Sequence, residues 1–339
     1  MTVLVTGAAG FIGYHVAKRL LSAEQRIVAV DSLNAYYDVG LKRARLRNLE
    51  AYPNFTFHKM DIADAAALQR VFEQYRPGCV IHLAAQAGVR YSIESPDAYV
   101  TSNLVGFGNI LEACRHFGVG HLVFASTSSV YGANVTVPFS EHHLTDHPVS
   151  FYAATKKANE VMAHSYAWLY GLPCTGLRFF TVYGPWGRPD MALFRFTDAI
   201  LSDDPIDVYN NGDMVRDFTY IDDIVEGVIR ILEVPPRGDA MWRAEDPDPA
   251  TSSACFRVFN LGHGKPVPLM SYIEVLERSL GKKAKVRFLP MQPGDVYKTY
   301  ADTTELRVAV GYEPVTSVED GVKQFVDWYR DYYKRQAAF

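Results

Sequence analysis

Residues 2–13, TVLVTGAAGFIG, form the stretch that predicts the fold. Residues 2–6 are a run of apolar and β-branched side chains, which is typical of a strand buried on both faces. Gly7, Gly10 and Gly13 follow directly: the first permits a tight turn, the second lets backbone approach a pyrophosphate, and the third lets a helix pack closely on the strand. The start of that helix offers free N–H groups to phosphates. The pattern therefore predicts a dinucleotide site, with a glycine-rich turn lacking any ligand as the alternative.

A carboxylate at the end of the second predicted strand indicates which dinucleotide binds. Asp31 closes the run 26–31, where it would accept both hydroxyls of an adenosine ribose and repel a 2′-phosphate. NAD is therefore the expected cofactor, rather than NADP. The residues expected to line the cofactor site are Gly7, Gly10, Phe11, Ile12, Gly13, Asp31, Asn34, Asp61, Ile62, Leu83, Ala84, Ala85, Ala87, Asn103, Tyr152, Lys156 and Phe179. For those that merely end a strand, ordinary strand-end packing is the alternative.

Outward from this site, short apolar runs alternate with amphipathic stretches. Strands are expected at 2–6, 26–31, 55–59, 79–83, 121–125 and 174–179, and helices at 11–23, 40–50, 64–75, 96–117 and 152–170. Such alternation predicts right-handed βαβ units, and hence an α/β fold with a Rossmann-type, doubly wound parallel sheet. We expect this NAD-binding domain at residues 1–182, with a later segment at about 213–235 returning to it. Residues 183–339 are expected to form mainly a smaller, irregular α/β lobe that binds the substrate.

Composition excludes several classes of protein. The 339 residues carry 34 Lys and Arg against 38 Asp and Glu, a net charge of −4, which does not suit a dedicated nucleic-acid binder. No apolar run is long enough to span a membrane, and the N-terminal sequence lacks the pattern of a secretory peptide. The 4 cysteines stand singly, without metal-type spacing. We therefore expect a cytoplasmic protein that binds no metal, membrane or nucleic acid.

Two side chains in the second half of the predicted sheet domain have the pattern of an acid–base pair. Tyr152 and Lys156 lie four residues apart at the start of a predicted helix, and so on one face of it. A phenol has a pKa of about 10, and a neighbouring cation favours its ionised form, so that it can act as a base near neutrality. A solvated surface pair is the alternative. Residues 126–129, STSS, follow the strand 121–125 at the carboxyl end of the sheet, where α/β folds bind ligands.

Together these motifs resemble a known family. The glycine pattern of 7–13, VYG at 130–132 and YxxxK at 152–156 are similar to those of the extended short-chain dehydrogenases/reductases, which include nucleotide-sugar epimerases, dehydratases and decarboxylases. The resemblance covers nearly the whole chain, including RDFTYIDD at 216–223 and NLG at 260–262.

The resemblance implies particular roles and an assembly. Tyr152 would be the catalytic base, Lys156 its helper and a ligand of the nicotinamide ribose, and Thr127 the third catalytic residue. The predicted helices at 96–117 and 152–170 would form a four-helix bundle in a homodimer, although their apolar residues also suit the core of a monomer.

The residues after Thr127 indicate the reaction. Sugar 4,6-dehydratases of the family carry an Asp-Glu pair there, and uronate decarboxylases carry a Glu at the second position, whereas this chain has Ser128 and Ser129. Without a second acid, a 4-keto intermediate is expected to be reduced again on its other face. The resemblance therefore implies an isomerase that performs a 4-epimerisation and regenerates NAD in each cycle.

The segment 178–191, RFFTVYGPWGRPDM, resembles the UDP-glucuronate 4-epimerases of the family, whereas UDP-glucose epimerases typically have Asn at the position of Thr181. The implied reaction converts UDP-glucuronic acid to UDP-galacturonic acid. Its 4-keto intermediate is a β-keto acid that loses CO₂ unless its carboxylate is restrained. Ser128, Ser129 and Thr181, with Arg188 as a charge partner, are expected to hold that carboxylate; a loop-stabilising role is the alternative for Arg188.

Four further residues are expected to bind the UDP half of the substrate. Arg216 matches a family arginine that grips the diphosphate, for which a guanidinium fork is suited. Arg90 matches a residue that lines the sugar-diphosphate cleft, Tyr209 would lie against uracil, and Asp295 would accept the ribose hydroxyls. Loop packing is the alternative for each.

Other functions remain open at this point. A UDP-glucose 4-epimerase or a UDP-glucuronate decarboxylase of the same family is one alternative. A non-catalytic protein that senses the dinucleotide is another, although such a sensor would not need Thr127, Tyr152 and Lys156 together.

Overall fold

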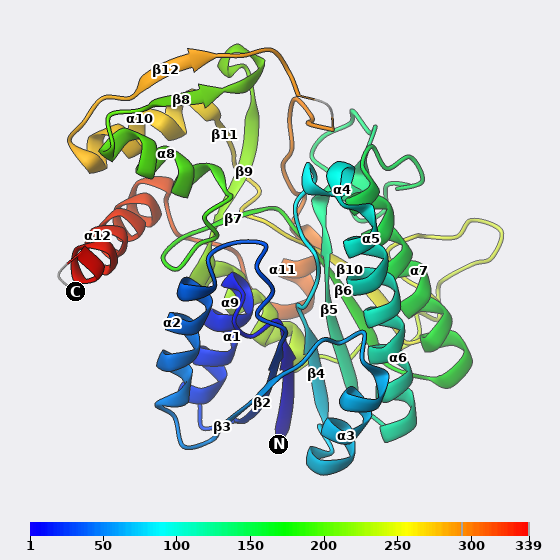
Figure 1. The fold of residues 1–339 in the computed structure, drawn as a ribbon. Coiled ribbons are helices and arrows are strands. Elements are labelled where there is room, and N and C mark those ends of the chain that lie inside the picture. The colour runs from blue at the N-terminus through cyan, green and yellow to red at the C-terminus, as the bar shows by residue number, and fades with distance from the viewer. Residues whose placement is uncertain (293, 338–339) are drawn as a thin grey trace.

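A seven-stranded parallel sheet forms the centre of the protein (Figure 1). The computed structural model describes residues 1–292 and 294–337, so the last two residues of the predicted substrate lobe lie outside the described part. The strand order is β10-β6-β5-β4-β1-β2-β3, and all neighbouring strands run parallel. The strands are β1 Thr2–Thr6, β2 Arg26–Asp31, β3 Phe55–Lys59, β4 Cys79–His82, β5 His121–Thr127, β6 Cys174–Phe179 and β10 Phe256–Leu261. The predicted α/β fold with a doubly wound parallel sheet is confirmed.

Helices cover both faces of this sheet, because successive side chains of a buried strand point to opposite sides. In β1, Val3 and Val5 belong to the core under one layer of helices, and Leu4 belongs to the core under the other. The first layer contains α1 Phe11–Ser22, α2 Val39–Glu50 and α9 Ile221–Leu232, and the second contains α3 Ala65–Tyr75, α6 Gly106–Phe117 and α7 Phe151–Tyr170 (Figure 1). Both faces of the sheet are therefore shielded, and its edge at the carboxyl ends of the strands is left for ligands.

The helix expected at 96–117 is interrupted. It consists of α5 Pro96–Tyr99, a π-helical segment at Val100–Val105, and α6. Within the π-helical segment the backbone carbonyl of Asn103 accepts a hydrogen bond from Asn159 Nδ2 at 2.6 Å. The Asn159 side chain of α7 thus satisfies a carbonyl at the place where the regular hydrogen-bonding pattern of the helix is broken. The apolar periodicity of the sequence did not indicate this break.

Strand β10 comes from far along the chain and pairs with β6. The segment predicted to return to the sheet domain, at about 213–235, contains α9. Strand β10 was not predicted from the sequence. The division of the chain at residue 182 stays a prediction.

A second group of elements lies above the carboxyl edge of the sheet, at the upper left of Figure 1. It contains two small sheets, with the orders β11-β9-β7 and β12-β8. Their strands are β7 Thr181–Tyr183, β8 Pro205–Val208, β9 Val215–Tyr220, β11 Pro266–Pro268 and β12 Lys285–Phe288. Further α-helices in the described ranges are α4 Tyr91–Glu94, α8 Ala192–Leu201, α10 Leu269–Leu280, α11 Thr304–Val310 and α12 Val318–Ala337. In the described ranges, none of the helices is both long and apolar enough to cross a bilayer.

Candidate active site

A cleft of about 880 Å³ lies between the carboxyl edge of the parallel sheet and the group of elements that contains the two small sheets. Thr127 and every residue predicted to bind cofactor or substrate line this cleft, with the exception of Asn103. Asn103 is buried, and its amide is engaged by the backbone of Gln86 and by Thr155 Oγ1. It therefore supports the wall of the cleft, while the roles of the residues that line it stay predictions.

The glycine loop has the shape that a bound pyrophosphate requires. Gly7 has a φ of 72°, and a Cβ at this position would stand 2.7 Å from the backbone nitrogen of Ala84. A Cβ on Gly13 would stand 2.1 Å from the carbonyl oxygen of Gly7. Among the described residues no side chain caps the N-terminus of α1, and Phe11, Ile12 and Gly13 of its first turn line the cleft, where their N–H groups suit a phosphate. The loop is thus a cradle that side chains would fill.

Asp31 lies next to this loop at the end of β2. Its Oδ2 accepts a hydrogen bond from the backbone of Ala9 at 3.0 Å, and its Oδ1 accepts one from Leu33 at 2.8 Å. Lys42 also lines the cleft here, and its Nζ donates to the carbonyl and side-chain oxygens of Asn34, each at 2.7 Å. Lys42 was not predicted as a site residue, because nothing in the sequence distinguishes it from other lysines on an amphipathic helix. The cradle and the acceptor at Asp31 fit NAD.

Tyr152 and Lys156 lie in the first turns of α7, which Ser150 caps by accepting a hydrogen bond from the backbone of Ala153 at 3.1 Å. Burial raises the pKa of Tyr152, whereas the positive charge of Arg188 and a hydrogen bond with Thr127 act to lower it. Burial lowers the pKa of Lys156 to about 8, and the charge of Glu160 opposes this shift. The phenol therefore has a hydroxyl partner and a cation nearby, the cation being Arg188.

A buried ion pair lies directly behind these groups. Glu160, one helical turn after Lys156, accepts hydrogen bonds from Ser126 Oγ at 2.6 Å and from Arg178 Nε and Nη2, both at 2.9 Å. The side chains of Glu160 and Arg178 are 4% and 0% exposed. The pair joins the end of β5, which carries Thr127, to β6 and to α7. Glu160 was not predicted as a site residue, although its position four residues after Lys156 places the two side chains on one face of the helix.

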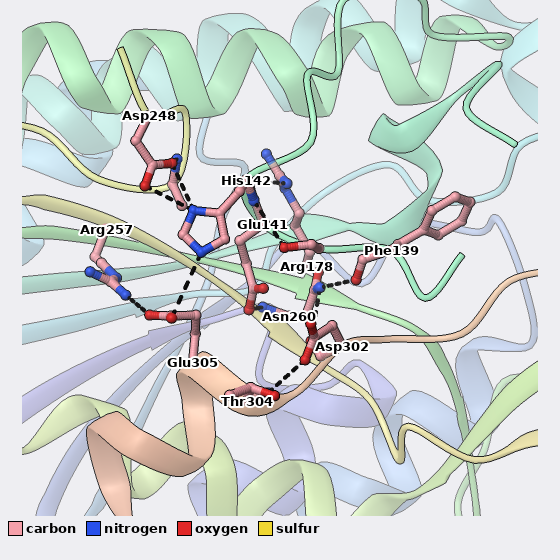
Figure 2. A network of polar contacts seen from close by, with 12 residues as sticks. Phe139, Glu141, His142, Arg178, Asp248, Arg257, Asn260, Asp302, Thr304 and Glu305 are labelled. Atoms are coloured by element: carbon pink, nitrogen blue, oxygen red, sulfur yellow. Dashed lines mark hydrogen bonds and ion pairs between the residues drawn. The ribbon is translucent and has the colours of Figure 1, made fainter. Parts of the chain in front are cut away.

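Arg178 is also linked, through Tyr131, to Asn260 on the edge strand β10. Its Nη1 donates to Tyr131 Oη at 3.1 Å, and Tyr131 Oη donates to Asn260 Oδ1 at 2.6 Å. The backbone nitrogen of Asn260 donates to Glu141 Oε1 at 2.6 Å, and burial raises the pKa of Glu141 to about 7. Figure 2 shows Glu141, Asn260 and Arg178 together, with His142 beyond them. This network fixes the turn that follows Thr127.

The residues predicted to meet the sugar gather beside Tyr152. Thr127 Oγ1 donates to Ser129 Oγ at 3.3 Å, and Ser128, Ser129 and Thr181 line the cleft. Arg188 lines it as well, but its guanidinium is paired with Asp190, through Nε to Oδ1 at 3.0 Å and Nη2 to Oδ2 at 2.5 Å. Arg188 thus both faces the cleft and stabilises its own loop.

The four residues predicted to hold the nucleotide meet at the other end of the cleft. Arg90 Nη2 lies 3.3 Å from Asp295 Oδ2, and the guanidinium of Arg90 lies 4.9 Å from the centre of the Tyr209 ring. Arg216 Nη1 donates to the backbone carbonyls of Val215 and Tyr297. In the described part of the chain no carboxylate forms an ion pair with Arg216, so its positive charge is available to a diphosphate.

The fold and the cleft define a class of protein that binds NAD along the edge of a parallel sheet and presents a Tyr, a Lys and hydroxyls to a second ligand. The family model described as "NAD dependent epimerase/dehydratase family" matches residues 3–243. The chain belongs to the NAD-dependent epimerase/dehydratase family. The predicted resemblance to the extended short-chain dehydrogenases/reductases is thereby confirmed.

Individual relatives are similar over the whole chain. A probable UDP-glucuronate 4-epimerase of Rhizobium meliloti is 51% identical over 336 residues, which cover 99% of this chain and 98% of the relative. The crystal structure of a UDP-glucuronic acid 4-epimerase from Bacillus cereus, in complex with UDP-glucuronic acid and NAD, matches with a TM-score of 0.86 and 33% identity, over 98% of this chain and 100% of that one. A UDP-glucose 4-epimerase from Thermotoga maritima, with UDP-glucose, matches with a TM-score of 0.85 and 32% identity over the same shares.

These similarities establish an NAD-dependent nucleotide-sugar epimerase, which is an isomerase. The predicted cofactor, NAD, is confirmed, and the alternative of a non-catalytic sensor is not supported.

Proposed function

We propose that this protein converts UDP-glucuronic acid to UDP-galacturonic acid by epimerisation at C4. The observation that carries the proposal is the group of Ser128, Ser129, Thr181 and Arg188 in one cleft with Tyr152. This group offers hydroxyls and a cation to a sugar carboxylate, and it holds none of the acids that a dehydratase or decarboxylase of the family would need. The names of the relatives from Rhizobium meliloti and Bacillus cereus support the same substrate.

In this proposal the residues around Tyr152 move the proton. Bound NAD would accept a hydride from C4 of the sugar and return it to the opposite face. Tyr152 Oη takes the proton of the 4-hydroxyl and later gives it back, which is general base and then general acid catalysis. The Thr127 hydroxyl orients the phenol by the hydrogen bond that also acts to lower its pKa. Lys156 binds the nicotinamide ribose and adds positive charge beside it.

Epimerisation also requires that the sugar turn while the nucleotide stays in place. Arg216, Arg90, Tyr209 and Asp295 would hold the UDP half at the far end of the cleft, where their charges and ring are already gathered. Once its carboxylate leaves the contacts with Ser129 and Thr181, the hexose stays tethered through its diphosphate linkage. It is free to rotate and present its other face to the cofactor.

Incubation of the purified protein with UDP-glucuronic acid, followed by NMR, tests the proposal. We expect UDP-galacturonic acid to accumulate to an equilibrium mixture without release of CO₂. Turnover of UDP-glucose with none of UDP-glucuronic acid would instead favour the second candidate, a UDP-glucose 4-epimerase, which the similarity to the Thermotoga maritima enzyme supports. A UDP-4-keto-pentose as the main product would favour a decarboxylase.

Replacement of Thr181 by Ala tests the restraint of the carboxylate. We expect the ratio of decarboxylated to epimerised product to rise about tenfold, because a hydrogen bond to a charged group is lost and the carboxylate of the 4-keto intermediate can leave the ring plane. Both products are measured by NMR with UDP-glucuronic acid as substrate. Thr136→Ala, at an exposed loop position, is the control and should not change the ratio. An unchanged ratio in both Thr181→Ala and Ser129→Ala would contradict the restraint.

We also propose a homodimer in which α7 and the preceding helices pack against a second copy in a four-helix bundle. On α7, Val161 and Trp168 are 58% and 59% exposed, whereas Phe107, Ile110 and Leu111 of α6 are fully buried in the monomer. The first two are thus available to a partner, and so are Leu169 of α7, 66% exposed, and Val105 before α6, 50% exposed. We expect light scattering of the purified protein to give twice the mass of one chain, and a monomeric mass would contradict the dimer.

A further inference from the structure

The segment 184–191, here called the strap, carries Arg188 from β7 to α8. Two turns shape it: the backbone nitrogen of Gly187 donates to the carbonyl of Gly184, and that of Met191 donates to the carbonyl of Arg188, both at 3.1 Å. Within the first turn Trp186 has a φ of 61°, an unfavourable value for a residue with a side chain. Such a backbone persists only where its surroundings hold it.

Side chains of the two helices next to the glycine loop hold three consecutive carbonyls of the strap. Arg45 Nη2, from α2, donates to the carbonyl of Trp186 at 2.6 Å and to that of Gly187 at 3.1 Å. His15 Nε2, from α1, donates to the carbonyl of Pro185 at 2.9 Å. Burial lowers the pKa of His15 to about 3, so this ring is neutral near pH 7 and its proton lies on Nε2.

The same arginine is bonded to the glycine loop. Its Nη1 donates to the carbonyl of Ala9 at 2.8 Å and to Tyr37 Oη at 2.7 Å. Arg45 is fully buried, and among the described residues no carboxylate forms an ion pair with it. Its hydrogen bonds go to neutral oxygens, and the carboxylate of Asp31 acts on its charge without a direct ion pair. Burial of a charge without a direct counter-ion is costly. An apolar side chain would fill the space at lower cost, so the hydrogen bonds themselves require an explanation.

We propose that Arg45 is a positioning residue, which acts through Arg188 by joining the glycine loop to the strap. One guanidinium spans Ala9, in the loop expected to bind the pyrophosphate, and Trp186 and Gly187, which directly precede Arg188. The Arg188 guanidinium, paired with Asp190, is thereby held at a set distance from the cofactor and from Tyr152. The inference rests on the proposed function, because Arg188 is the residue expected to meet the sugar carboxylate.

A double-mutant cycle between Arg45 and Arg188 tests this coupling. In Arg45→Lys the single ammonium cannot reach both the glycine loop and the strap, and we expect kcat/KM for UDP-glucuronic acid to fall by about 10- to 100-fold. In an Arg188→Ala background the same substitution should change kcat/KM by less than about twofold, since the residue through which it acts is gone. The affinity for UDP, which Arg188 is not expected to contact, should stay unchanged. Full additivity of the two substitutions would overturn the proposal.

Hydrogen exchange of the NAD-loaded protein gives a readout that does not depend on the substrate. Arg45→Lys should speed exchange of the amides of Gly187 and Met191, whereas Arg47→Lys, at an exposed position of the same helix, should not. If Arg45→Lys does not fold, Tyr37→Phe, which removes one hydrogen bond of the Arg45 guanidinium, serves instead and should have the same effects to a smaller extent. Failure of the wild-type protein to convert UDP-glucuronic acid would overturn only the proposed function, whereas unchanged exchange in the variant would overturn the role of Arg45.

Discussion

Tyr152→Phe is expected to lower kcat for UDP-glucuronic acid by about 10³-fold, because the variant has no group to take the proton of the sugar 4-hydroxyl. The ring of Tyr152 packs edge-on against that of Tyr99, with the ring centres 6.0 Å apart, and Phe preserves this contact. Lys156, which lies one turn further along α7, keeps its place. The loss should therefore appear in kcat, while the dissociation constant for UDP-glucuronic acid changes little. Stopped assays by NMR and calorimetric titration measure the two quantities.

Tyr170→Phe is a matched control, because Tyr170 is the last residue of the same helix and its side chain is exposed. It should retain the activity of the wild type. A Tyr152→Phe variant with more than a tenth of the wild-type kcat would show that another group carries the proton. Arg188 is no candidate for that role, since a guanidinium does not give up its proton in this range of pH.

The second large effect is expected on stability. Glu160→Gln should lower the free energy of unfolding by about 3–5 kcal/mol, because it leaves the charge of the buried Arg178 without a counter-ion. The amide would keep one acceptor for the two donors of Arg178 and for Ser126 Oγ. Burial by itself would raise the pKa of Glu160, but the charge and hydrogen bonds of Arg178 lower it below its usual range, so the carboxylate is ionised at pH 7. Denaturant titration of the NAD-loaded protein measures the loss.

Asp327→Asn provides the comparison. It breaks the ion pair between Lys323 and Asp327 on α12, whose side chains are 71% and 59% exposed, and should leave the free energy of unfolding nearly unchanged, because water screens an exposed pair. An equal, small effect of Glu160→Gln would contradict the importance of the buried pair. Since the pair also joins the strand end at Thr127 to the helix of Tyr152, we expect the variant to lose activity as well as stability.

Local patterns in the sequence were enough to predict the sheet and the cofactor loop. The positive φ of Gly7 and the close approach of Gly13 to the Gly7 carbonyl need glycine for reasons that lie within a few residues. The four-residue spacing of Tyr152 and Lys156 places them on one helix face whatever the rest of the chain does. Asn103 is the predicted cofactor residue that does not line the cleft. Its amide is hydrogen-bonded to Gln86 and Thr155, and no local pattern of the sequence reveals these contacts.

By itself, then, the sequence determined the class of fold, the glycine cradle and the pairing of a phenol with an ammonium, because helical period, strand alternation and the conformational freedom of glycine act over short stretches of chain. Only the tertiary structure decided which distant groups meet. Arg45 reaches a strap 141 residues away, Arg90 meets Asp295 across 205 residues, and Arg178 finds Glu160 inside the core. Such contacts depend on how whole elements pack, and a buried charge takes as partners whatever oxygens the packing brings within reach.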